Sequence, residues 1–171
     1  MSDSKSVELG SEREELISEI RAAFHGISRG NGVTLHEARA IDDYKSEEER
    51  KQARELDHDK SWDEIPDADI KHYHDVFSFF DVEGFRYHLP AYMIWAVRYF
   101  DVSESCSSDN VIYVLSRSRI LAERDAQVFN SFDLAQCRAI CRFLKFMASN
   151  PMFADADAAN LALDEHWSRF Y

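Results

Sequence analysis

The sequence predicts a mainly α-helical fold, a single compact domain of several helices around a buried central helix at about residues 90–100. The first observation is an aromatic-rich run over residues 76–100, whose last twelve residues carry one charge, that of Arg98. Each large aromatic side chain there gains about 1.5–3 kcal/mol from burial, so the run must be covered on most sides. The second is the helical spacing of apolar residues along most of the chain. The third is size, because 171 residues, 45% of them hydrophobic, suffice for one core.

Four capping boxes, Ser/Thr-x-x-Glu, predict helix starts in the first half of the chain. We expect a disordered tail over residues 1–10, which are small, polar and charged, and one helical domain over residues 11–171. The apolar spacing predicts a helix over residues 12–25, a short one ending near residue 44 and a polar surface helix over residues 47–56. The four boxes are Ser11–Glu14, Thr34–Glu37, Ser46–Glu49 and Ser61–Glu64.

The middle of the chain contains a turn that precedes the central helix. Gly84 follows Asp81 and Glu83, which predicts a tight turn with Gly84 free to adopt positive φ. Pro90 then suits the first turn of the buried helix. We expect at most a minor β element near residues 85–89 or 111–115, where short apolar runs fit a strand as well as a helical turn.

Two helices are predicted at the C-terminal end. Ser131 or Asp133 caps a helix that continues to about residue 149, and residues 154–170 form the last one. Cys137 and Cys141 lie one turn apart on the apolar face of the first of these helices. Thiols in such positions behave as small hydrophobes, so we expect neither a metal site nor a reactive thiol there.

Charge limits the classes of partner. The chain has 32 acidic and 20 basic residues, a formal net charge of −12. Such a surface repels phosphate backbones and anionic lipid headgroups, so we expect no nucleic acid and no membrane among the partners. No run approaches the roughly 20 apolar residues that span a bilayer, and no signal peptide is evident. With an odd number of cysteines, these features predict a cytoplasmic protein with free thiols.

The acidic residues concentrate in residues 37–69, which contain 13 acidic and 6 basic residues. Short helices that carry these carboxylates would form a rigid negative surface that attracts a basic partner, although many charged faces are merely solvated. The partner-binding residues that we predict are Asp42, Asp43, Glu47, Glu48, Glu49 and Glu55.

A second polar group interrupts the aromatic run, and its predicted members are Asp81, Glu83, Arg86 and His74. A turn followed by an arginine favours a structural salt bridge, but paired carboxylates also perform acid–base catalysis. His72 and His74 point in different directions on a helix, and no metalloprotease-type motif is present, so no metal and no cofactor are expected.

Several blocks of the sequence resemble a family of small bacterial proteins described as a domain of unknown function. The resemblance extends from about residue 14 to residue 170, and its most specific part is G-F-R-Y-x-L-P-A-Y at residues 84–92. It implies a bacterial, cytoplasmic single domain and transfers no catalytic residue. The other blocks are Leu35-His-Glu-Ala, Asp42-Asp43-Tyr44, Ser61-Trp62, Asp81-x-Glu and Gln136 with Phe143-Leu144.

The leading hypothesis is a non-enzymatic, acidic protein-binding domain, of the type of an immunity protein that inhibits a bacterial toxin. Nucleophile elbows, phosphate-binding glycine loops and dinucleotide fingerprints are absent from the sequence, which favours binding over catalysis. The alternative is a metal-dependent hydrolase with a carboxylate and histidine site near residues 72–83.

Overall fold

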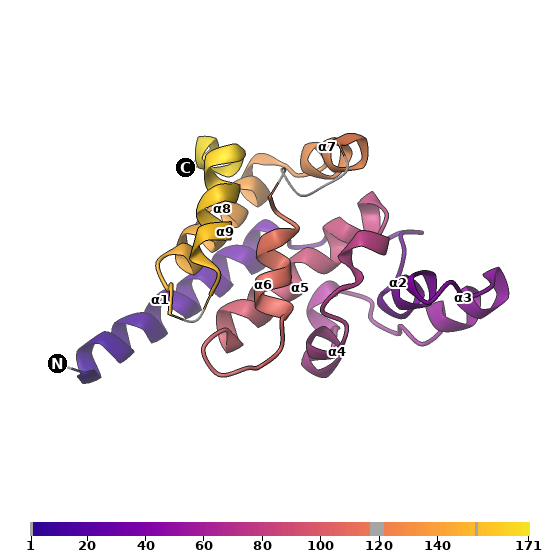
Figure 1. The fold of residues 1–171 in the computed structure, drawn as a ribbon, viewed down its shortest axis with the longest axis horizontal. Coiled ribbons are helices and arrows are strands. Elements are labelled where there is room, and N and C mark those ends of the chain that lie inside the picture. The colour runs from indigo at the N-terminus through magenta and orange to yellow at the C-terminus, as the bar shows by residue number, and fades with distance from the viewer. Residues whose placement is uncertain (1, 117–121, 153) are drawn as a thin grey trace.

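Helix α5 (Val82–Tyr99) lies at the centre of the molecule, and the other elements pack around it (Figure 1). The computed structural model describes residues 2–116, 122–152 and 154–171, and these residues form helices and connecting segments without a strand. The other elements are α1 (Ser2–Ala23), α2 (Leu35–Asp42), α3 (Glu47–Arg54), η1 (Trp62–Glu64), α4 (Asp67–His72), η2 (Val76–Phe79), α6 (Ser107–Tyr113), α7 (Ala122–Asn130), α8 (Leu134–Ala148), α9 (Ala156–Glu165) and η4 (Trp167–Phe170).

The prediction of a buried central helix is confirmed, although α5 begins eight residues earlier than expected. All residues from 89 to 97 are buried. A strand at 85–89 is wrong, because this stretch is already helical; its alternation of aromatic and polar residues resembles a strand, but α5 is covered on most sides and buries both kinds. Pro90 therefore lies inside the helix, where it lacks the N–H that would bond to the carbonyl of Arg86.

The C-terminal half packs α8 against α1 and α9, while α6 packs on α5 and α9. Asp133, rather than Ser131, caps α8, and its side chain forms a capping box with Gln136. The apolar run at residues 111–115 is not a strand, because its first residues belong to α6. Helix α7, which packs against α5, was not predicted.

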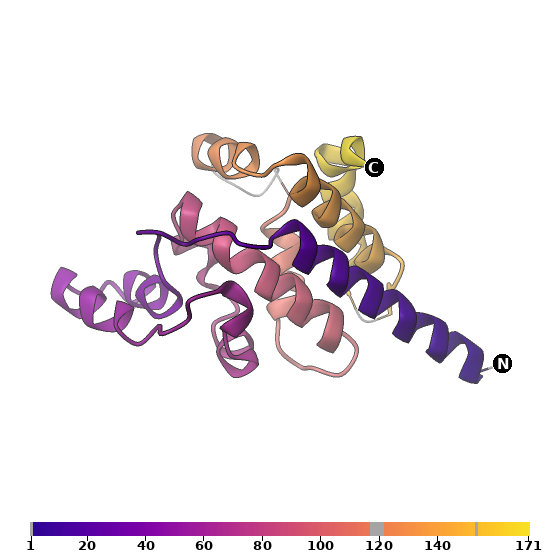
Figure 2. The same ribbon diagram turned by 180° about the vertical axis from the view of Figure 1, so that it is seen from behind.

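Helix α1 begins at Ser2, so the structure describes residues 2–10 as helical where we expected a disordered tail. Ser11 lies inside this helix and does not cap it. Extending a formed helix costs far less than nucleating one, and the buried residues Leu16, Ile17 and Ile20 hold the helix to the core. The N-terminal end of α1 extends beyond the other helices (Figure 2).

Helices α2 and α3 pack against each other at the opposite end of the molecule from the N-terminus (Figures 1 and 2). The predicted capping boxes at Thr34 and Ser46 are both confirmed. The box at Ser61 is wrong, because no side chain caps η1 there. Trp62 nevertheless packs inward, and its indole N–H donates to the carbonyl oxygen of Phe24 at 2.9 Å.

Candidate functional site

The α2–α3 pair, with the two residues after it, carries all the residues that we predicted to bind a partner. We call residues 35–56 the acidic hairpin. Its turn is a Schellman motif, in which the N–H of Lys45 bonds to the carbonyl of Ala40 and that of Tyr44 to the carbonyl of Ile41. The motif requires a left-handed residue at the position that Tyr44 occupies, and its φ is 55°. Glycine is usual there, because a side chain in this conformation costs about 1–2 kcal/mol.

Ion pairs within the acidic hairpin neutralise part of its charge. Asp42 and Asp43 both face Arg39, at 2.5 and 4.0 Å, and Arg39 also contacts Asp75 on the neighbouring segment. Three carboxylates therefore share one guanidinium group. The surface here keeps a net negative charge, although less than the sequence alone suggests.

On α3 the predicted residues differ in how far they are paired. Glu47 lies 3.2 Å from Lys51, and Glu49 lies 3.7 Å from Lys45 while also capping the helix. Glu48 and Glu55 have no ion-pair partner among the residues that the structure describes. These two side chains are thus the free carboxylates of the predicted set.

The acidic hairpin is attached to α5 by a junction of two glycines and one aspartate. The Asp81 carboxylate caps α5 by accepting the N–H of Gly84 at 2.8 Å, and the same oxygen accepts the N–H of Val33 at 3.0 Å. A Cβ atom on Gly84 would lie 2.6 Å from the Val33 carbonyl oxygen, and one on Gly32 would lie 2.7 Å from the Gly84 nitrogen. The backbones therefore meet where only glycine fits.

Half-buried polar groups support this junction from the segment that follows the acidic hairpin. The Asp59 carboxylate accepts hydrogen bonds from Arg29 at 2.8 Å and from the Tyr87 hydroxyl at 2.7 Å. Burial and the hydrogen bond to Asp59 raise the pKa of Tyr87 well above its ordinary value, so it stays protonated. Asp57 binds the His36 ring at 2.7 Å. The base of the acidic hairpin is thus fixed by several half-buried contacts.

A third contact joins α2, α3 and the glycine loop before them. The Arg54 guanidinium donates to Glu37 at 2.6 Å and to the carbonyl oxygen of Gly32 at 2.9 Å. Side chains at the base are therefore used for structure, and those at the turn and on the outer side of α3 remain exposed.

The second predicted polar group is not brought together. Asp81 caps α5, Arg86 reaches Gln136 on α8 at 3.3 Å, and the His74 ring contacts Asn110 on α6 at 3.1 Å. No ion pair joins Asp81 or Glu83 to Arg86, so the predicted salt bridge is absent from this part of the described chain. Gly84 has no positive φ, and its role is close packing instead.

Metal ligands and thiols do not form a site in the described residues. These residues contain no group of three or more His, Cys, Asp or Glu side chains placed to hold a metal ion. Cys137 and Cys141 are buried on α8 as expected, and burial raises the pKa of both thiols. Cys106 is the exposed thiol of the three.

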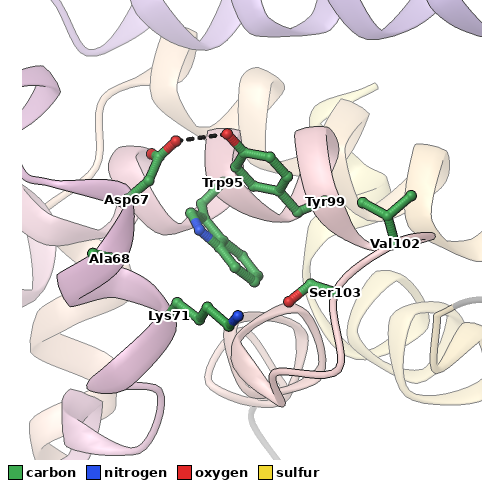
Figure 3. Close-up of a pocket in the computed structure, with 7 residues that line it drawn as sticks. All are labelled: Asp67, Ala68, Lys71, Trp95, Tyr99, Val102 and Ser103. Carbon is green, nitrogen blue, oxygen red and sulfur yellow. Dashed lines mark hydrogen bonds between the residues drawn. The ribbon is translucent and has the colours of Figure 1, made fainter.

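A groove of about 290 Å³ lies between α4, the C-terminal end of α5 and the segment after it (Figure 3). The Trp95 indole occupies the middle of the view, and the Tyr99 hydroxyl donates to Asp67 at 2.8 Å. That hydrogen bond raises the pKa of Tyr99. The lining residues are Asp67, Ala68, Lys71, Trp95, Tyr99, Val102 and Ser103.

Sequence reasoning missed both the groove and Tyr44. The groove combines residues about 30 positions apart, so no local pattern indicates it. Tyr44 had one usable signal: a helix that ends at about residue 44 without a glycine needs another residue in the left-handed position.

The family model of DUF6714, described as a family of unknown function, matches residues 12–170. Comparisons with curated proteins and with solved structures give no match. None of the described helices is both long enough and apolar enough to cross a bilayer.

Proposed function

We propose that this chain, which belongs to the DUF6714 family of unknown function, is a non-enzymatic domain that binds a basic protein through its acidic hairpin. The observation that carries this proposal is the exposed Tyr44 at the turn, beside carboxylates that the hairpin's own cations neutralise in part. Its side chain is 93% exposed, although its backbone conformation is costly. Strained residues that make few contacts of their own are typical of functional surfaces.

The chemistry of the acidic hairpin suits a partner that presents arginine or lysine. Tyrosine offers a rigid ring for apolar and cation–π contacts, and tyrosines are common among the residues that dominate binding energy. Asp42, Asp43 and Glu48 supply nearby negative charge, which raises the association rate of a basic protein. Because the base of the acidic hairpin is already fixed, little conformational freedom is lost on binding, so the entropic cost of binding is lower.

The most specific form of this proposal is a bacterial, cytoplasmic immunity protein that inhibits a basic toxin. The experiment is calorimetry with the purified products of neighbouring genes at two salt concentrations. Binding that weakens as salt rises supports the proposal. Absence of binding to any neighbour, or binding that salt does not affect, counts against it. The dispersed positions of Asp81, Glu83, Arg86 and His74 lend no comparable support to a metal-dependent hydrolase.

Neutralising the outer carboxylates of α3 should slow association. In the variant Glu47→Gln, Glu48→Gln, Glu55→Gln, the association rate with the basic partner is expected to fall about threefold to tenfold at low ionic strength, since these residues supply steering charge. Glu49 is left intact because it caps α3. Stopped-flow or surface-plasmon measurements give the rate.

The matched control removes three exposed carboxylates from α1, with Glu12→Gln, Glu14→Gln, Glu15→Gln. Both variants lose three negative charges. Equal slowing in the two would mean that only net charge matters, and the acidic hairpin would not be the interface.

Exchanging Tyr44 should separate stability from binding. Tyr44→Gly is expected to raise the free energy of unfolding by about 0.5–1 kcal/mol, because glycine relieves the left-handed strain. The same change should weaken partner binding, whereas Tyr44→Phe keeps the ring and should leave both properties nearly unchanged. Urea unfolding tests the first effect without a partner. A glycine variant that is less stable would show that the Tyr44 ring holds the turn instead.

A further inference from the structure

The groove of Figure 3 is built from an apolar floor and two polar sides. The Trp95 indole lies beneath the groove and is only 2% exposed, so the open apolar surface consists of the ring of Tyr99 and the methyl groups of Ala68 and Val102. Val102 is 76% exposed. The groove therefore offers apolar contact area that the described residues do not fill.

The two charged side chains of the groove differ in whether they have a partner. The Asp67 carboxylate already accepts the Tyr99 hydroxyl at 2.8 Å, and its other oxygen lies 4.0 Å from Arg98. The Lys71 ammonium has no ion-pair partner among the described residues. In Figure 3 the Lys71 side chain extends past the indole toward Ser103. The free charge of the groove is therefore positive, in a protein of net charge −12.

We propose that this groove binds a small aromatic monocarboxylate, with its ring against Tyr99 and Val102 and its carboxylate at Lys71. Ser103 lines the same groove and supplies a hydroxyl donor for the carboxylate (Figure 3). A volume of about 290 Å³ holds one ring with a short chain, and it lies at the lower end of the range for small-molecule sites, about 300–1,000 Å³. This site is separate from the acidic hairpin and does not depend on the proposed partner.

The preference of the groove for an anion over a cation is opposite to that of the rest of the surface. A protein with this net charge attracts amines and repels carboxylates everywhere else. An amine of the same shape would also meet Asp67, but that carboxylate is already hydrogen-bonded and partly neutralised. Preference for the anion over the matched cation is thus a property of Lys71 and not of the general field.

The test is an NMR titration of the full chain with 3-phenylpropionate and, separately, with 3-phenylpropylamine. The anion is expected to bind with a millimolar or lower Kd and to shift the signals of Lys71, Tyr99, Ser103 and the Trp95 indole N–H. The amine should bind at least threefold more weakly at these positions. Equal or tighter binding of the amine, shifts confined to other residues, or no shift at 10 mM probe, about ten times the expected Kd, would overturn the proposal.

Two variants test whether Lys71 binds the carboxylate of 3-phenylpropionate. Lys71→Met keeps the chain length and removes the charge, and it is expected to weaken binding of 3-phenylpropionate about threefold to tenfold. Lys60→Met is the matched control, because Lys60 is also an exposed lysine without an ion pair to any described residue. An unchanged Kd in Lys71→Met, or an equal loss in Lys60→Met, would show that Lys71 does not hold the carboxylate. Both side chains are exposed, so neither variant should unfold.

Discussion

Gly84→Ala is expected to lower the free energy of unfolding by about 3 kcal/mol, one of the two largest effects anticipated for a single change in this protein. The added Cβ would lie 2.6 Å from the Val33 carbonyl oxygen and 2.8 Å from the Asp81 carboxylate. The first of these atoms belongs to the backbone and the second holds two N–H groups, so neither can move without breaking the junction.

Gly10→Ala is the control for this prediction. Gly10 lies in α1, and nothing comes within 4 Å of a Cβ built there. Alanine in an unobstructed helix should add about 0.5–1 kcal/mol. Urea unfolding of the two variants gives the comparison directly. If Gly84→Ala proved as stable as Gly10→Ala, the junction would have enough freedom to accept a side chain, and the close contact would not fix the acidic hairpin.

Acid should destabilise the folded chain through His88. This side chain is fully buried, stacks on Phe80 at 4.2 Å and places its Nδ1 2.7 Å from the Gly84 carbonyl oxygen. A carbonyl only accepts, so Nδ1 carries the proton of the neutral ring. The other nitrogen, Nε2, is buried without a hydrogen-bond partner among the described residues, so a second proton there would have no acceptor.

The lowered pKa of His88 sets the pH range over which stability is lost. Burial, with a smaller effect of Arg29, lowers the pKa of His88 from 6.5 to about 4, although Gly84, Asp59 and Asp57 oppose the change. Between these values the unfolded chain binds a proton that the folded chain does not. Stability is therefore complete above pH 6.5 and is lost as pH falls toward 4, by about 3 kcal/mol in total.

The variant His88→Asn isolates this contribution. Asparagine keeps a donor for the Gly84 carbonyl and does not titrate. It is expected to be less stable than the natural chain at pH 7, because the ring leaves a cavity, but its stability should fall by about 2–3 kcal/mol less between pH 7 and pH 4. Urea unfolding at several pH values measures both slopes. If the variant does not fold, NMR titration of the His88 ring in the natural chain decides the question; titration near pH 6.5 would refute the assignment.

Much of the fold was accessible from the sequence, since its strongest signals are local. The capping residues Thr34, Ser46 and Asp133 form the predicted bonds, and residues 89–97 of the apolar run are buried as expected. The wrong predictions fall where contacts between residues far apart in the sequence determine the structure. Gly84 was interpreted as a turn residue, because nothing in the sequence indicates that Val33 lies against it.

The candidate site was less predictable for the same reason. The residues of the acidic hairpin were identified from charge alone, but their pairing depends on which cations lie nearby in space. Arg39 contacts three carboxylates, whereas Glu48 forms no ion pair with any described residue. Asp81 and Arg86 are close in sequence, but Asp81 caps α5 and Arg86 reaches Gln136 on α8.

The junction at Gly32, Gly84 and Asp81 has a consequence for how this family can diversify. It holds the base of the acidic hairpin through backbone contacts and half-buried pairs, while the turn and the outer side of α3 contribute little to the core. Substitutions on the outer side should therefore cost little stability and leave the scaffold unchanged. Relatives with the same core can therefore carry different side chains at these positions without a new fold.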